Sequence, residues 1–213
     1  MKAIILAGGH SKRFGSPKAF ACIHGEMFYK RIINTLTETN LFDDIIISTN
    51  KQLKNEFEYK QIMIDEETHA DKGPLSGIYT VMKHYNNEEL FFVVSVDTPM
   101  ITKEAISQLY QFTISQRMEH QADIIAYSDN DKPIPTIAFY SRGVISNIEK
   151  ALNSNDYSLR HVYKNVITCF LDTKEVQPLK NWSKNINYQD DLNTLLHQIN
   201  DCLLYTSDAA DER

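Results

Sequence analysis

Residues 1–18 read MKAIILAGGHSKRFGSPK, and this stretch decides the fold. Residues 3–7 form a short apolar run that stops abruptly at two glycines, as a buried strand does when it enters a tight turn. Glycine allows a positive φ and lets a ligand come close to the main chain. Exposed N–H groups in such a turn, with Arg13 and Lys18 nearby, can hold a polyphosphate. The stretch therefore predicts a strand that leads into a phosphate-binding loop.

This loop is neither of the two commonest phosphate-binding motifs, because it contains no G-x-x-x-x-G-K-[ST] and no G-x-G-x-x-G. A plain connection with solvated basic residues would also explain two adjacent glycines. The combination of those glycines with Arg13, Gly15 and Lys18, directly after an N-terminal strand, favours phosphate binding.

Apolar runs and helical spacings alternate along the chain, and runs that are apolar on both faces suit a parallel sheet covered by helices. We expect strands at residues 2–7, 44–48, 61–64, 90–96, 123–127, 135–140 and 166–172. We expect helices from 26 and from 73 onward, and near 103–116, 144–152 and 188–200. The prolines in 132–135 argue against an interior strand there and indicate the entry to an edge or to a mixed part of the sheet. The pattern predicts an α/β fold: a doubly wound, mostly parallel, Rossmann-like sheet with helices on both faces.

Composition narrows the class of protein. The chain has 213 residues and a formal net charge of −6, with no basic block, so nucleic-acid binding is disfavoured. No apolar run is long enough to cross a membrane, and Cys22, Cys169 and Cys202 are read as free thiols of a cytoplasmic protein. Residues 1–200 are expected to form one domain, with 201–213 as an appended tail outside the core.

Polar residues follow the first four predicted strands. Gly8 and Gly9 come after the first, Ser48 and Asn50 after the second, Asp65 after the third and Asp97 after the fourth. Because ligands of open parallel sheets bind outside the carboxyl ends of the strands, these residues are expected on one rim. Asp97 is the candidate Mg²⁺ ligand, although a turn or helix-capping aspartate would look the same.

Residues 6–18, LAGGHSKRFGSPK, resemble the L-A-G-G-x-S-x-R-M-G-x-x-K signature of nucleotidyltransferases, and more narrowly of the molybdenum cofactor guanylyltransferases, which make molybdopterin-guanine dinucleotide. Phe14 stands at the usual methionine. The resemblance implies nucleotide binding by Leu6, Ala7, Gly8, Gly9, Lys18, Asp65 and Asp97. It also implies catalysis by Arg13, Lys18 and Asp97, with Mg²⁺ on Asp97.

Further segments resemble the same family. Residues 73–77, GPLSG, match its G-P-L-[AS]-G turn, and Asn185 and Asn187 match an N-x-N element on the pterin side. Asn187 could equally cap the last helix, and either Ser48 or Asn50 could supply the asparagine contact seen in the family. Pro135, Thr136 and Arg160 also fall at pterin-side positions.

The resemblance implies transfer of GMP from GTP to molybdenum-carrying molybdopterin, with release of pyrophosphate. It also implies transient contact with proteins that deliver or accept the cofactor. The alternatives are a molybdopterin cytidylyltransferase, whose motif would read L-A-A-G, a sugar-phosphate nucleotidyltransferase, and a non-catalytic nucleotide-binding regulator.

Overall fold

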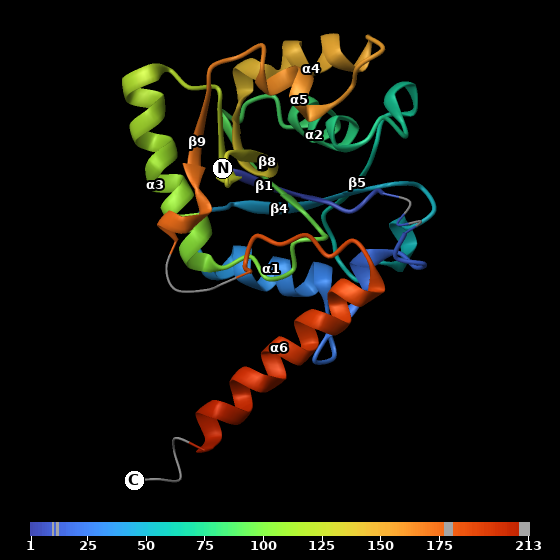
Figure 1. The fold of residues 1–213 in the computed structure, drawn as a ribbon. Coiled ribbons are helices and arrows are strands. Elements are labelled where there is room, and N and C mark those ends of the chain that lie inside the picture. The colour runs from blue at the N-terminus through green and yellow to red at the C-terminus, as the bar shows by residue number, and fades with distance from the viewer. Residues whose placement is uncertain (10, 12, 177–180, 209–213) are drawn as a thin grey trace.

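A seven-stranded sheet forms the centre of the structure, a computed structural model that describes residues 1–9, 11, 13–176 and 181–208 (Figure 1). Its strands are β1 (Lys2–Leu6), β4 (Asp44–Thr49), β5 (Ile62–Ile64), β6 (Leu90–Ser95), β7 (Ile124–Asp129), β8 (Lys132–Ser141) and β9 (Thr168–Asp172). Their order is β5-β4-β1-β6-β8-β7-β9, and only β8 among them runs opposite to the rest. The mostly parallel sheet expected from the sequence is confirmed.

Helices cover both faces of this sheet. They are α1 (Phe28–Glu38), α2 (Pro74–His84), α3 (Lys103–His120), α4 (Ile145–Leu152), α5 (Leu159–Tyr163) and α6 (Gln189–Asp208). One face packs against α1, α3 and α6, and the other against α2, α4 and α5 (Figure 1). Short 3₁₀ turns lie at Lys18–Phe20, Lys54–Glu56, Glu67–His69, Arg142–Val144 and Thr173–Glu175.

The helices form where apolar residues recur at helical spacing. Phe28, Ile32 and Leu36 give α1 a fully buried stripe, and burying each such side chain stabilises the fold by about 1.5–3 kcal/mol. A two-stranded hairpin, β2 (Cys22–Ile23) and β3 (Glu26–Met27), precedes α1, so this helix begins two residues later than expected.

The order of strands creates the crevice in which a ligand can bind. The chain moves outward from β1 to β4 and β5, then returns to place β6 on the other side of β1. Such a reversal leaves an opening beyond the carboxyl ends of the neighbouring strands. The ends of β1, β4, β5 and β6 therefore face one common space.

Residues 132–135 belong to β8, which lies inside the sheet, so the expectation that they are not an interior strand is wrong. They do enter a mixed part of the sheet, because β8 is antiparallel to both β6 and β7. Pairing with β6 runs only from Leu90↔Ser141 to Val94↔Ile137, so the proline-bearing end of β8 extends past it. That end pairs with β7 alone, across a register shift. Prolines are tolerated at such a bulged, one-sided end because fewer ladder donors are needed.

The last helix is longer than expected, since α6 continues past residue 200 to Asp208. Residues 201–208 contain neither proline nor glycine to stop it. Cys22 and Cys169 are free thiols, whereas Cys202 lies outside the described side chains. The domain boundary at residue 200 stays a prediction.

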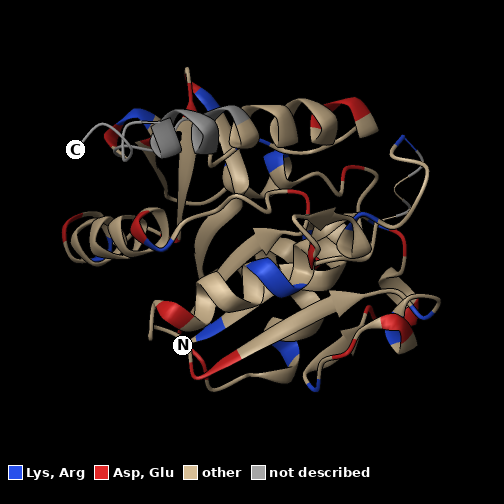
Figure 2. Ribbon diagram, turned by 90° about the horizontal axis from the view of Figure 1, so that it is seen from below, with Lys and Arg blue, Asp and Glu red and all other residues tan. Residues whose placement is uncertain are grey.

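Charges are mixed over the molecule. Figure 2 shows basic and acidic residues interspersed along the ribbon rather than gathered on the face in view. None of the helices in the described ranges combines the length and apolar character needed to cross a bilayer.

Candidate active site

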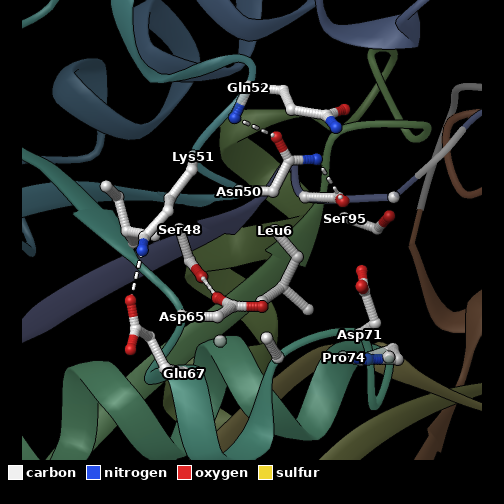
Figure 3. A pocket seen from close by; sticks show the side chains of 16 residues that line it. Leu6, Ser48, Asn50, Lys51, Gln52, Asp65, Glu67, Asp71, Pro74 and Ser95 are labelled. Atoms are coloured by element: carbon white, nitrogen blue, oxygen red, sulfur yellow. Dashed lines mark hydrogen bonds and ion pairs between the residues drawn. The ribbon is translucent and has the colours of Figure 1, made fainter.

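A pocket of about 440 Å³ occupies the crevice beyond β1, β4, β5 and β6 (Figure 3). Strand ends, the loops after them and the start of α2 all contribute to its wall. Residues singled out from the sequence make up much of this wall: Leu6, Gly8, Gly9, Ser48, Asn50, Asp65, Gly73 and Gly77. The structure thus brings these residues together on one rim.

Asp65 is the half-buried carboxylate of the pocket. Ser48 Oγ donates a hydrogen bond of 3.0 Å to Asp65 Oδ1, and the two side chains face each other in Figure 3. Burial raises the pKa of Asp65 to about 6, with a contribution from the charge of Asp71, while the Ser48 hydrogen bond opposes the rise. Asp65 therefore changes between a hydrogen-bond acceptor and a protonated donor close to neutral pH.

Asn50 has a different local role. Its Nδ2 donates to the Gly8 carbonyl at 3.0 Å, and its Oδ1 accepts from the backbone N–H groups of Gln52 and Leu53, each at 3.0 Å. These bonds fix the loop after β4 against the glycine loop. Ser48 and Asn50 both line the pocket, and a nucleotide contact by either one stays a prediction.

The glycines around the pocket differ in backbone conformation. Gly8 and Gly9 do not have the positive φ expected for them, whereas Gly15 and Gly73 do, at 85° and 70°. A Cβ on Gly8 would meet Thr49 only at an ordinary 3.5 Å. The expected close approach of a ligand to the main chain at Gly8 and Gly9 stays a prediction.

Gly77 lets α2 approach the sheet closely. A Cβ at this position would overlap Ser48 Oγ and lie 3.0 Å from Leu6 Cδ2 and 3.1 Å from Ser48 Cβ. The Ser48 hydroxyl therefore occupies the space that a side chain at position 77 would fill. Gly77 therefore permits the hydrogen bond between Ser48 and Asp65.

Lys18 and Asp97 meet beside the pocket, whose wall includes Ser95 at the end of β6. Lys18 Nζ lies 3.3 Å from Asp97 Oδ2 and donates to Asn187 Oδ1 at 2.8 Å. The Lys18 and Asp97 side chains are only 12% and 18% exposed. Ion pairs that are largely buried are screened less than surface pairs, so this contact carries weight in the charge balance of the site.

Asp97 keeps one oxygen available. Oδ1 is buried and has no hydrogen-bond partner among the described residues. No cluster of three or more potential histidine, cysteine or carboxylate ligands occurs in the part of the chain that the structure describes. A single carboxylate oxygen fits Mg²⁺, which is usually bound by one or two carboxylates together with substrate phosphates.

The segment before α6 lies against the end of β6. Ile186 N–H donates to the Asp97 carbonyl at 2.7 Å, and Thr98 Oγ1 donates to Asn185 Oδ1 at 2.9 Å. Asp191 Oδ2 accepts from the N–H groups of Asn187 and of the next residue, each at 2.8 Å. Asp191 therefore caps this turn, and the Asn187 side-chain oxygen is occupied by Lys18.

Some predicted residues stand apart. Ala7 is buried behind the pocket, where its N–H donates to the Ser48 carbonyl at 2.8 Å. Arg13 and Arg160 are exposed, and neither is joined to the Lys18–Asp97 pair by a described hydrogen bond or ion pair. Pro135 and Thr136 are half-buried in β8, in the part that runs past β6.

Sequence reasoning also missed residues of the site. Lys51, Gln52, Asp71 and Ser95 line the pocket, and Thr98 anchors the Asn185 segment. Most of them lie within three residues of a position that had been singled out, so proximity to a strand end was the available signal.

A protein-family model described as the MobA-like NTP transferase domain matches residues 3–171. The structure of molybdopterin-guanine dinucleotide biosynthesis protein A from Archaeoglobus fulgidus superposes with a TM-score of 0.76 and 19% identity, covering 94% of this chain and 100% of that chain. The structure of CMP:2-keto-3-deoxy-manno-octonic acid synthetase complexed with CTP superposes with a TM-score of 0.67 and 13% identity, covering 93% of this chain and 98% of that chain. The structure of Rv0371C complexed with manganese, from Mycobacterium tuberculosis H37Rv, superposes with a TM-score of 0.60 and 12% identity, covering 92% of this chain and 97% of that chain. At these identities the superpositions show a common fold.

Proposed function

Because the chain belongs to the MobA-like NTP transferase domain family, we propose that it transfers GMP from GTP to molybdenum-carrying molybdopterin and releases pyrophosphate. The observation that carries this proposal is the Lys18–Asp97 pair, which stands beside a pocket with a carboxylate in its wall. In this proposal the pocket takes the base of a nucleoside triphosphate, and the Lys18–Asp97 pair beside it takes the phosphates.

The pocket chemistry supports guanine as the base. Guanine carries N1–H and N2–H₂ donors on one edge, and Asp65 is an acceptor when it is ionised. Above a pH of about 6 the carboxylate form of Asp65 predominates and can accept from both donors. Cytosine and adenine each offer a single amino donor on the corresponding edge, so each would donate from one group to the Asp65 carboxylate where guanine donates from two.

The reaction is a direct displacement at phosphorus. The terminal phosphate of molybdopterin attacks the α-phosphorus of GTP, a new P–O bond forms, and pyrophosphate leaves with the electrons of the broken bond. Lys18 offsets the charge that grows on the leaving pyrophosphate, and Arg13 in the same loop adds a second positive charge. The protein's task is therefore to position the substrates and to neutralise charge.

Asp97 would hold Mg²⁺ through its unpartnered Oδ1. The bound ion supplies neutralisation of phosphate oxygens. Asn185 and Asn187 stand next to Asp97, on the side that the proposal gives to the pterin. The protein would act in the cytoplasm, where the reduced forms of its cysteines persist.

Pyrophosphate release tests this function directly. The chain is mixed with molybdenum-carrying molybdopterin, Mg²⁺ and one of GTP, CTP or ATP. We expect turnover with GTP to exceed the others by up to about 10⁴, the range open to a pocket that hydrogen-bonds its substrate. Equal turnover of CTP contradicts the guanylyl assignment, and absence of pyrophosphate with every nucleotide contradicts an enzymatic role.

A further inference from the structure

Asn187 shares the ammonium of Lys18 with Asp97. The hydrogen bond from Lys18 Nζ to the Asn187 amide oxygen is 2.8 Å, whereas the distance to Asp97 Oδ2 is 3.3 Å. An ammonium between a carboxylate and an amide normally makes its shorter bond to the charged acceptor. Here the neutral acceptor has the shorter bond, so the Lys18 ammonium lies closer to Asn187 than to Asp97.

The partial separation leaves Asp97 able to take a cation. Its Oδ1 is buried without a described partner, and its Oδ2 accepts from Lys18 Nζ at 3.3 Å, slightly beyond the usual range for an N–H···O bond. If Lys18 settled fully on this carboxylate, the ammonium would neutralise the charge that attracts a metal ion. Lys18 would also be less free to move onto incoming phosphates.

We propose that Asn187 is a positioning residue that holds Lys18 off Asp97 and so keeps the carboxylate ready for a divalent cation delivered with the nucleotide. This inference rests on the proposed nucleotidyl transfer. It gives Asn187 a role on the nucleotide side of the site, before any pterin is present.

The surrounding contacts make Asn187 rigid enough for this role. The adjacent Ile186 N–H is bonded to the Asp97 carbonyl, and Asn185 is bonded to Thr98. Asp191 fixes the backbone N–H of Asn187 itself at 2.8 Å. These bonds fix the backbone at Asn187 relative to Asp97, so the Asn187 amide oxygen stays within reach of the Lys18 ammonium.

Mn²⁺ binding in the presence of GTP and the absence of pterin tests the proposal. Free Mn²⁺ is followed by its paramagnetic resonance signal for the parent chain, Asn187→Ala and the near-isosteric Asn187→Leu. We expect both variants to bind Mn²⁺ about tenfold more weakly, the effect of losing one hydrogen bond to a charged group. Asn193→Ala removes an exposed asparagine of α6, the helix that follows Asn187, and should stay within about twofold of the parent.

A double-mutant cycle with Lys18→Met separates positioning from a merely structural role. With Lys18 absent, Asn187→Ala should change Mn²⁺ binding by less than about twofold, because the group it positions is gone. Effects that simply add in the double variant would overturn the proposal, as would parental Mn²⁺ binding by both Asn187 variants. Melting curves establish that each variant is folded.

The same titration is run with CTP and ATP. If the parent chain bound Mn²⁺ only together with CTP, the guanylyl assignment would fail. The comparison of Asn187 variants would then be made with CTP and would still decide whether Asn187 positions Lys18.

Discussion

Gly77→Ala should disturb the pocket beyond β1, β4, β5 and β6 through a single methyl group. The new Cβ would overlap Ser48 Oγ and press on Leu6 Cδ2 at 3.0 Å. Ser48 is 2% exposed and sits in β4, so its hydroxyl has little room to turn away. Overpacking of this kind costs about 1–3 kcal/mol, against which alanine in a helix gains up to about 1 kcal/mol over glycine.

The net loss in the free energy of unfolding is about 1–2 kcal/mol, which lowers the melting temperature by roughly 2–8 °C for a chain of this size. The Ser48 hydrogen bond lowers the pKa of Asp65, so its loss should move that pKa further up from about 6. GTP affinity at pH 7 should fall accordingly. Calorimetry and a pH titration of GTP binding measure the two effects.

Two further variants make the test specific. Gly143→Ala serves as the control, because its Cβ would meet Asp123 at an ordinary 3.5 Å and its φ is not positive. Ser48→Ala removes the overlapped hydroxyl, so adding it to Gly77→Ala should restore most of the lost melting temperature. Purely additive losses in that double variant, or an unchanged Gly77→Ala protein, would refute the steric reasoning.

Asp97→Asn should lower kcat by about 10²–10³ and weaken GTP binding less, as followed in a Mg²⁺ titration; parental turnover with unchanged Mg²⁺ dependence would move the metal site elsewhere. Its stability should change little, because the carboxylate it removes already has Lys18 at 3.3 Å. Asp65→Asn should raise the free energy of unfolding more at pH 7.5 than at pH 4.5. The pKa of Asp65 is about 6 in the folded protein and 3.8 in the unfolded chain, so ionising this carboxylate destabilises the native state progressively as the pH rises from about 4 to about 6. Denaturant unfolding at both pH values measures this, and an equal gain at each would disprove it. Deletion of residues 202–213 should leave activity and melting temperature nearly unchanged, since Leu192 and Leu195 of α6 are the buried residues upstream; a large drop in melting temperature would place the tail in the core.

Local patterns were sufficient to predict most of the fold. The buried residues Leu90–Val94 of β6 and the stripe of Phe28, Ile32 and Leu36 in α1 follow directly from apolar runs and helical spacing. The prolines of 132–135 argued against an interior strand, yet they lie in β8, where the strand runs past β6 and pairs with β7 alone. The sequence does not reveal where a neighbouring strand ends. The end of α6 was misplaced because a break in periodicity is not a stop signal without glycine or proline.

The convergence of residues at the strand ends could be predicted from topology, because parallel strands carry their carboxyl ends to one edge. The contact of Lys18 with Asn187 could not, since it joins positions 169 residues apart through side chains alone. The raised pKa of Asp65 was equally hidden, because it depends on how deeply a particular loop is buried.

The location of Asn185 and Asn187 at the end of β6 means that the two halves of the site come from distant parts of the chain. The last strand of the sheet, β9, ends at Asp172, and the family match ends at residue 171. Asn187, which accepts from Lys18 beside Asp97, lies fifteen residues after Asp172. The contacts of Lys18 are therefore completed by a segment that follows the last strand of the sheet. A chain that stopped at β9 would keep every residue that lines the pocket but would lack Asn187 as an acceptor for Lys18.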